Sequence, residues 1–180
     1  MIRLGVLGST RGTDLQAILD AIQNHTLDAE VVVVVSNRNK SYILERARHH
    51  NIPDVFVSQK GKTRDEFDRE ITATLLQHGA DLVLLIGFMR ILSAEFCQKW
   101  HDRILNVHPS LLPKYAGGMD NDIHEEVLRN GDVETGCTIH FVTEEVDAGP
   151  ILIKKKCTVA GKDTVESLKT KVQQLEGMAF

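Results

Sequence analysis

The stretch Ile2-Arg-Leu-Gly-Val-Leu-Gly8 runs into the turn Ser9-Thr-Arg-Gly-Thr-Asp14, and a helical pattern follows from Leu15 to Ile22. The first stretch is rich in apolar residues and favours a buried strand. From Leu15 to Ile22, apolar side chains recur at spacings of three and four residues, which gives a helix one apolar face to pack on a sheet. A strand, a short turn and a covering helix predict the first unit of an α/β fold.

Short apolar runs and longer amphipathic stretches alternate along the chain, which predicts a parallel sheet flanked by helices. Strands are predicted near residues 2–8, 30–36, 54–58, 81–87, 103–108, 136–142 and 150–157. Helices are predicted near residues 13–25, 40–50, 63–78, 93–100, 122–130 and 163–177. Thr63 and Glu66 have the spacing of a capping box at the start of the third helix, and Gly79 is placed to end it. Because no repeat or linker divides the chain, residues 1–180 are expected to form a single domain.

The composition of the chain is that of a globular protein. Its 180 residues are 42% hydrophobic and 26% charged, which excludes disorder and collagen-like repeats. The longest apolar runs, such as residues 31–35, are far shorter than the ~20 residues of a membrane-spanning helix. The N-terminus lacks the pattern of a secretion signal, so we expect a cytoplasmic protein without membrane contact.

Charge and cysteine content exclude further classes of protein. The net charge of −4 gives no general attraction to nucleic acid, so no nucleic-acid partner is expected. Cys97, Cys137 and Cys157 form no Cys-x-x-Cys pair, and we therefore expect neither a disulfide framework nor a metal site.

The turn from Gly8 to Asp14 is a candidate phosphate site, because small residues between a strand and a helix leave backbone N–H groups free. It matches neither the ATPase P-loop nor the complete dinucleotide fingerprint. Arg11 could pair with a phosphate, whereas the carboxylate of Asp14 would repel one and is expected to point away. The alternative is a tight turn in which Thr13 or Asp14 caps the helix, and the sequence leaves both open.

The strongest local signal is Ile104-Leu-Asn-Val-His-Pro-Ser-Leu-Leu-Pro-Lys-Tyr-Ala-Gly-Gly118, which begins as a strand and is stopped by proline. Pro109 keeps His108 extended. Alternation along the strand puts Asn106 and His108 on the same face. They lie at the C-terminal edge of the predicted sheet, where open α/β folds bind ligands.

A second polar cluster is the turn Thr143-Glu-Glu-Val-Asp-Ala-Gly-Pro150, in which Asp147 is the candidate carboxylate. Near His108 it would favour the imidazolium and orient the ring, as a general acid or base requires. With an amide donor from Asn106, these groups describe acyl transfer, in which an amine attacks a carbonyl and the oxyanion is held by the protein. The alternatives are an Asn106 that caps a loop, a core His108 and an Asp147 that starts a turn. His140, on the strand before the turn, either supports the site or is simply buried.

Four segments together make the chain resemble the phosphoribosylglycinamide formyltransferases over nearly its whole length: Gly8–Asp14, Gly87-Phe-Met-Arg-Ile-Leu92, Asn106-Val-His-Pro-Ser-Leu-Leu-Pro113 and Asp147-Ala-Gly-Pro150. These enzymes, also called glycinamide ribonucleotide transformylases, belong to the folate-dependent formyltransferase family. The resemblance implies a Rossmann-like, open, mostly parallel twisted sheet with helices on both faces. It also implies an enzyme of purine biosynthesis and one-carbon metabolism that moves the formyl group of 10-formyltetrahydrofolate, its co-substrate, to the amine of 5-phosphoribosylglycinamide without a metal.

The resemblance assigns a role to each matching residue. His108 would polarise the formyl group and donate a proton, Asn106 would hold the oxyanion, and Asp147 would raise the pKa of His108 and help to carry the amine's proton. The ribonucleotide would be bound by Gly12, Thr13, Asp14, Gln173 and Glu176. The folate would be bound by Arg64, Met89, Arg90, Ile91, Leu92, Asn106, Thr143, Glu144, Glu145, Val146 and Asp147. Taken alone, residues 89–92 would be interpreted as core packing.

Three features depart from the family pattern. The phosphate turn ends in Asp14, where the family usually has asparagine, and the segment after Tyr115 is longer than usual. The family normally continues past the helix that ends near Glu176, and apolar surface left uncovered there would favour homo-oligomers.

Rival interpretations share parts of this pattern. A 10-formyltetrahydrofolate hydrolase would use the same three residues with water as the acceptor. Methionyl-tRNA and sugar-amine formyltransferases would carry added domains. A nucleotide-binding module would use only the turn from Gly8 to Asp14 and would catalyse nothing.

Overall fold

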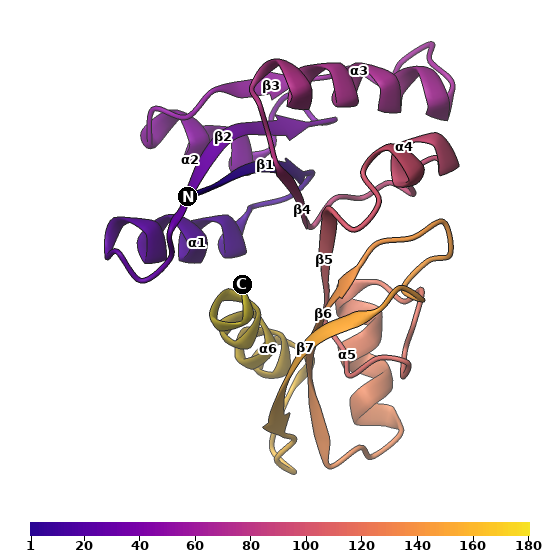
Figure 1. Ribbon diagram of the computed structural model, residues 1–180. Coiled ribbons are helices and arrows are strands. Elements are labelled where there is room, and N and C mark those ends of the chain that lie inside the picture. The colour runs from indigo at the N-terminus through magenta and orange to yellow at the C-terminus, as the bar shows by residue number, and fades with distance from the viewer.

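Seven strands form one twisted sheet in the computed structural model, which describes residues 1–180 (Figure 1). Their order in space is β3-β2-β1-β4-β5-β6-β7. They are β1 (Ile2–Gly8), β2 (Ala29–Ser36), β3 (Asp54–Phe56), β4 (Leu82–Ile86), β5 (Ile104–His108), β6 (Glu134–Phe141) and β7 (Ile151–Thr158). The pairs among β1 to β5 are parallel, whereas β5 with β6 and β6 with β7 are antiparallel. The predicted open, mostly parallel sheet is confirmed.

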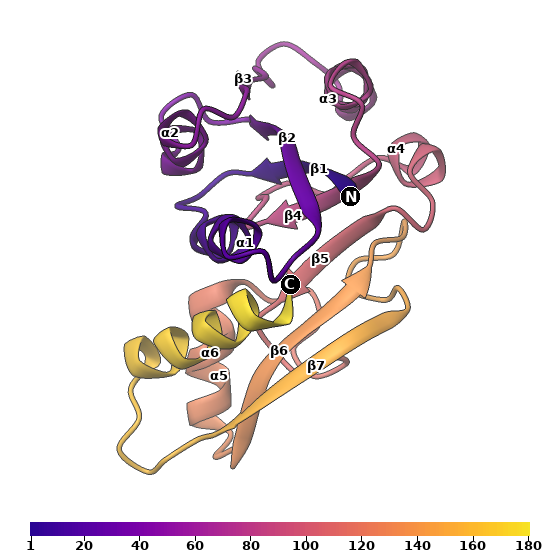
Figure 2. The ribbon, with the colours of Figure 1, turned by 60° about the vertical axis from the view of Figure 1, so that its left-hand side comes forward.

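Six helices lie on the two faces of this sheet. They are α1 (Thr13–Gln23), α2 (Tyr42–His49), α3 (Arg64–Gln77), α4 (Ala94–Lys99), α5 (Asp120–Arg129) and α6 (Val165–Ala179). Figure 2 shows α1, α2 and α6 on one side of the sheet and α3 and α4 on the other. Every predicted strand and helix is present, and its ends differ from the prediction by at most two residues.

The hydrophobic core consists of two apolar layers, one on each face of the sheet. Leu15 of α1 and Val172 of α6 belong to the first layer, and Phe67 of α3 and Trp100 belong to the second. Strand β2 contributes side chains to both layers. A strand that is buried on both faces has a continuous apolar sequence, which is why Val31 to Val35 shows no alternation.

Helix α1 begins at a glycine. Gly12 is its N-cap and has a left-handed φ of 67°, and a Cβ on this residue would lie 2.5 Å from Cγ1 of Ile43. No side chain caps the helix, so the interpretation that Thr13 or Asp14 is the N-cap is wrong. Glycine is favoured here because the turn needs a positive φ and leaves no room for a side chain.

Helix α3 has both of its predicted end signals. The Thr63 side chain accepts a hydrogen bond from the Glu66 backbone at 3.2 Å, and the Glu66 carboxylate accepts one from the Thr63 backbone at 2.8 Å. After its last turn Gly79 has a φ of 67°. The capping box and the glycine stop are confirmed.

Removal of this cap should destabilise the fold. Thr63→Ala leaves the first-turn N–H groups without an acceptor, and we expect the free energy of unfolding to fall by about 1 kcal/mol. Urea denaturation of the variant and of the unaltered chain measures the difference. Thr74→Ala inside the same helix is the control, and it should cost less because alanine is the better helix former. Equal losses in both variants would contradict the role of the capping box.

Candidate active site

The carboxyl ends of three parallel strands meet at one edge of the sheet. Gly8 of β1 lies beside Ile86 of β4, and Leu85 of β4 lies beside Asn106 of β5. The order of the strands reverses between β1 and β4, so the segments that follow these strands diverge there. Such a point is where open α/β sheets bind ligands. His108, as the last residue of β5, lies at this edge.

The pairing of β5 with β6 brings a second histidine to the site. Asn106 lies directly opposite His140, and Nδ2 of Asn106 is 3.1 Å from Nε2 of His140. Nδ1 of His140 is 2.9 Å from the Phe141 carbonyl oxygen and donates to it. The ring of His140 therefore lies between this carbonyl and the side chains of Asn106 and Asp147.

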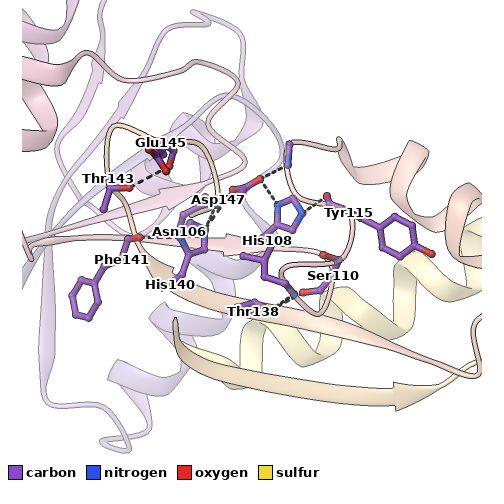
Figure 3. Close-up of polar contacts among 12 residues, drawn as sticks. Asn106, His108, Ser110, Tyr115, Thr138, His140, Phe141, Thr143, Glu145 and Asp147 are labelled. Carbon is purple, nitrogen blue, oxygen red and sulfur yellow. Dashed lines mark hydrogen bonds and ion pairs between the residues drawn. The ribbon is translucent and has the colours of Figure 1, made fainter. Parts of the chain in front are cut away.

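His108 and Asp147 are in contact, as predicted (Figure 3). Nδ1 of His108 is 3.2 Å from Oδ2 of Asp147, and both side chains are buried. Oδ2 also accepts a hydrogen bond of 2.8 Å from the Gly117 backbone, and Oδ1 lies 3.5 Å from Nε2 of His140. Asp147 has a left-handed φ of 54°, a conformation that aspartate adopts more readily than most residues.

The other ring nitrogen of His108 faces the backbone. Nε2 lies 2.9 Å from the carbonyl oxygen of Tyr115, whose φ is 60°. Such a φ is costly for an aromatic residue, and the Tyr115 hydroxyl is held by Asp132 at 2.8 Å and by Asn130 at 3.0 Å. The ring of His108 therefore lies between two acceptors, one on each nitrogen.

Burial and hydrogen bonding shift the pKa values of this cluster in ways that follow from the contacts. Burial lowers the pKa of His108, and this effect outweighs the charge of Asp147 and the Tyr115 carbonyl, which both raise it. Burial alone would raise the pKa of Asp147, but the hydrogen bonds from His140 and Gly117 and the charge of His108 bring it below its ordinary value. Asp147 acts on His108 in the expected direction, but the net pKa of His108 is lowered rather than raised.

This arrangement can stabilise an oxyanion and move a proton. Asn106 supplies an amide donor, His108 supplies a proton donor, and Asp147 favours the charged form of the ring. The lowered pKa of His108 makes its imidazolium a better acid near neutral pH.

The segment 89–92 is not all core, contrary to the alternative interpretation. Leu92 is buried, but Met89 and Ile91 are 40% and 55% exposed. Arg90 lies over the Phe67 ring at 4.4 Å and donates to Gln59 at 2.6 Å. Exposed apolar side chains beside the ligand-binding edge suit the flat ring of an aromatic ligand.

The remaining residues of the predicted folate site lie on two further segments. Arg64 is exposed at the start of α3, and its charge acts on Asp68 together with that of Arg90. In the turn before Asp147, the Thr143 hydroxyl donates to the Glu145 carbonyl, and Glu144 accepts a hydrogen bond from Gln98 of α4. Val146 is 51% exposed.

The predicted ribonucleotide residues form a second cluster. Gly12 and Thr13 lie at the start of α1, Gln173 is half-buried on α6, and the buried carboxyls of Asp14 and Glu176 lie close enough to act on each other. The guanidinium of Arg11 lies 5.9 Å from the centre of the Tyr42 ring. The structure brings α1 and α6 together here.

The sequence did not predict two groups of the site, the Tyr115 carbonyl and the Gly117 N–H. Both are backbone groups, so residue identity does not reveal them. His140, for which two interpretations were open, contacts both Asn106 and Asp147. No group of three or more His, Cys, Asp or Glu side chains is arranged to hold a metal ion. None of the helices has the length and apolarity to cross a membrane.

Residues 2–180 match the family model described as formyl transferase, and the chain belongs to this family. It is 40% identical over 172 residues to the phosphoribosylglycinamide formyltransferase of Escherichia coli (strain K12), covering 95% of this chain and 80% of that protein. It is 42% identical over 181 residues to the trifunctional purine biosynthetic protein adenosine-3 of Chironomus tentans, with 99% of this chain covered. The chain spans only 13% of the length of that protein. The crystal structure of glycinamide ribonucleotide transformylase 1 from Symbiobacterium toebii superposes with a TM-score of 0.94 at 39% identity, covering 99% of this chain and 83% of that one.

The charge of Asp147 should be detectable at His108. Asp147→Asn removes the contribution that raises the His108 pKa and leaves the burial that lowers it, so the pKa should fall further. Titration of the His108 ring followed by NMR measures this. Asp122→Asn, which removes an exposed carboxylate from α5, is the matched control and should leave the titration unchanged. A His108 pKa that stays the same or rises in Asp147→Asn would exclude the coupling.

Proposed function

We propose that the chain transfers the formyl group of 10-formyltetrahydrofolate to the amine of 5-phosphoribosylglycinamide, a step of de novo purine biosynthesis. The observation that carries the proposal is the contact of His108 with Asp147 beside Asn106, at the ligand-binding edge of a formyl transferase fold. The names of the relatives from Escherichia coli and Symbiobacterium toebii support the choice of acceptor.

The reaction needs no covalent intermediate on the protein. The acceptor amine attacks the formyl carbon, and the carbonyl oxygen becomes an oxyanion that Asn106 and protonated His108 stabilise. The tetrahedral intermediate then breaks its bond to N10 of the folate, which receives a proton as it leaves. Asp147 keeps His108 charged while the oxyanion exists and helps to carry the proton lost by the amine.

The two ligands have separate places in this proposal. The folate lies along residues 89–92 and the turn from Thr143 to Asp147, with Arg64 beside them. The ribonucleotide lies between α1 and α6, near Gly12, Thr13, Asp14, Gln173 and Glu176. A cytoplasmic location and self-association remain predictions of the sequence.

The direct test is formation of the folate product, followed by absorbance, with and without 5-phosphoribosylglycinamide. We expect turnover that depends on the acceptor. His108→Ala and Asn106→Ala should each lower kcat by ~10²-fold or more, because each removes a group that stabilises the oxyanion or donates the proton. His101→Ala, at an exposed histidine in the turn before β5 whose ring contacts Asp102, is the control and should retain full activity.

The other outcomes separate the rival interpretations. Turnover without the acceptor would identify a hydrolase of the formyl folate. A folded protein that binds the ribonucleotide but shows no turnover, before or after His108→Ala, would indicate a binding module.

A further inference from the structure

A cluster of buried ionisable groups lies between α1, α5 and α6, away from His108. Asp14 is 5% exposed, and its Oδ1 has no hydrogen-bond partner. Glu176 is 8% exposed, and His124 is fully buried with its Nε2 3.6 Å from Oδ1 of Asp120. Buried polar atoms without partners are rare in native proteins and call for an explanation.

Backbone N–H groups without an acceptor lie at the start of α1, next to Asp14. Helix α1 has eleven residues, and the N–H groups of Thr13, Asp14 and Leu15 have no acceptor within the protein. Free N–H groups at the positive end of a helix dipole bind phosphate. The carboxyl of Asp14 stands at this same helix end and would repel a phosphate if it were charged.

The surroundings of Asp14 decide its charge. Burial raises its pKa to about 7, and the charge of Asp120 acts in the same direction. Burial likewise raises the pKa of Glu176 to about 8, with the charge of Asp14 contributing. Lys169 binds Asp120 and, at 3.0 Å, Asn121, and its charge lowers the pKa of Glu176 without outweighing the effect of burial.

The other groups that face Asp14 or its helix do not remove this effect. Asp120 stays charged, since its pKa is lowered by a hydrogen bond with His124 and by Lys169. The Cys137 thiol on β6 is close enough to feel both carboxyls, and its own pKa is raised to about 12, so it is uncharged. Arg46 of α2 donates a hydrogen bond to the side chain of Gln16, which lies on α1. Nε2 of His50, directly after α2, lies 3.3 Å from the same Gln16 side chain.

We propose that Asp14 and Glu176 make acceptor binding proton-linked, because the phosphorylated acceptor binds the form of the protein in which both carboxyls are uncharged. In this form Asp14 and Glu176 can donate hydrogen bonds to the ribonucleotide instead of repelling its phosphate. Above neutral pH, binding then requires that the protein take up a proton. The proposal rests on the proposed function, since it assumes a phosphorylated acceptor between α1 and α6.

The test is the dissociation constant of 5-phosphoribosylglycinamide, measured by calorimetry without folate between pH 6 and pH 9. The measurement compares the unaltered chain with Asp14→Asn. The phosphate of the ligand titrates equally in both measurements. The dissociation constant of the unaltered chain divided by that of Asp14→Asn therefore reports on the protein alone. This ratio should rise with pH by roughly tenfold per pH unit above about 7, because only the unaltered chain must take up a proton at Asp14.

Two further variants make the result specific. Glu176→Gln should also weaken the pH dependence, at higher pH, because its carboxyl loses the proton later. Asp20→Asn, which removes an exposed carboxylate from the same helix, should follow the unaltered chain. A ratio that stays flat with pH, or an Asp14→Asn protein that folds and binds at no pH, would overturn the proposal. If Asp14→Asn fails to fold, an unchanged pH profile in Glu176→Gln overturns it.

The stability of the protein gives an independent measurement of the charge on Asp14. A carboxyl whose pKa is raised on folding costs stability as pH rises from its unfolded pKa to its folded pKa. The difference between the urea midpoint of Asp14→Asn and that of the unaltered chain should therefore increase from pH 4 to about 7, in favour of the variant. Above this pH the difference should stay constant. Equal midpoints throughout would show that Asp14 is not held protonated and would contradict the proposal. Failure of the proposed function is a different result, namely no acceptor-dependent turnover or no ribonucleotide binding by the unaltered chain at any pH.

Discussion

The carboxylate of Asp147 accepts contacts from three segments that are distant in the sequence. His108 comes from the end of β5, His140 from β6, and Gly117 from the loop that follows β5. Each contact helps to orient a group at this edge of the sheet. A carboxylate can do this because it only accepts hydrogen bonds and has room for several donors. Without it the ring of His108 would keep one acceptor, the Tyr115 carbonyl, and would be free to turn.

Two buried acids of the protein, Asp147 and Asp14, illustrate opposite outcomes of burial. Asp147 is surrounded by donors, so its pKa falls although it is buried. Asp14 has an oxygen without any donor and lies near further carboxyls, so its pKa rises to about 7. Burial therefore does not fix the charge of a carboxyl, and the hydrogen bonds that accompany burial decide it. In this chain the two acids lie at different places, one beside His108 and one beside the free end of α1.

Most of the fold could be predicted from the sequence because local patterns and tertiary packing agree. The alternation along β5 was sufficient to place Asn106 and His108 together, and the capping box placed the start of α3. The start of α1 was predicted less well, since Gly12 has a conformation that depends on contact with Ile43. The Tyr115 carbonyl and the Gly117 N–H could not be predicted, because the direction of a backbone group depends on φ and ψ rather than on the residue type. The net pKa of His108 was also beyond the sequence, since the degree of burial is a property of the packed structure.

The balance at His108 has a consequence for catalysis. A neutral imidazole carries a proton on one ring nitrogen only, whereas the imidazolium carries one on each. Here burial pushes the ring toward the neutral form, while Asp147 and the Tyr115 carbonyl each favour a proton on the nitrogen that faces them. A ring held between these influences can be charged while an oxyanion lies beside it and neutral afterwards. Both ring nitrogens face acceptors of the protein in this structure, so the Tyr115 carbonyl has to move away from Nε2 before that nitrogen can donate to an oxyanion.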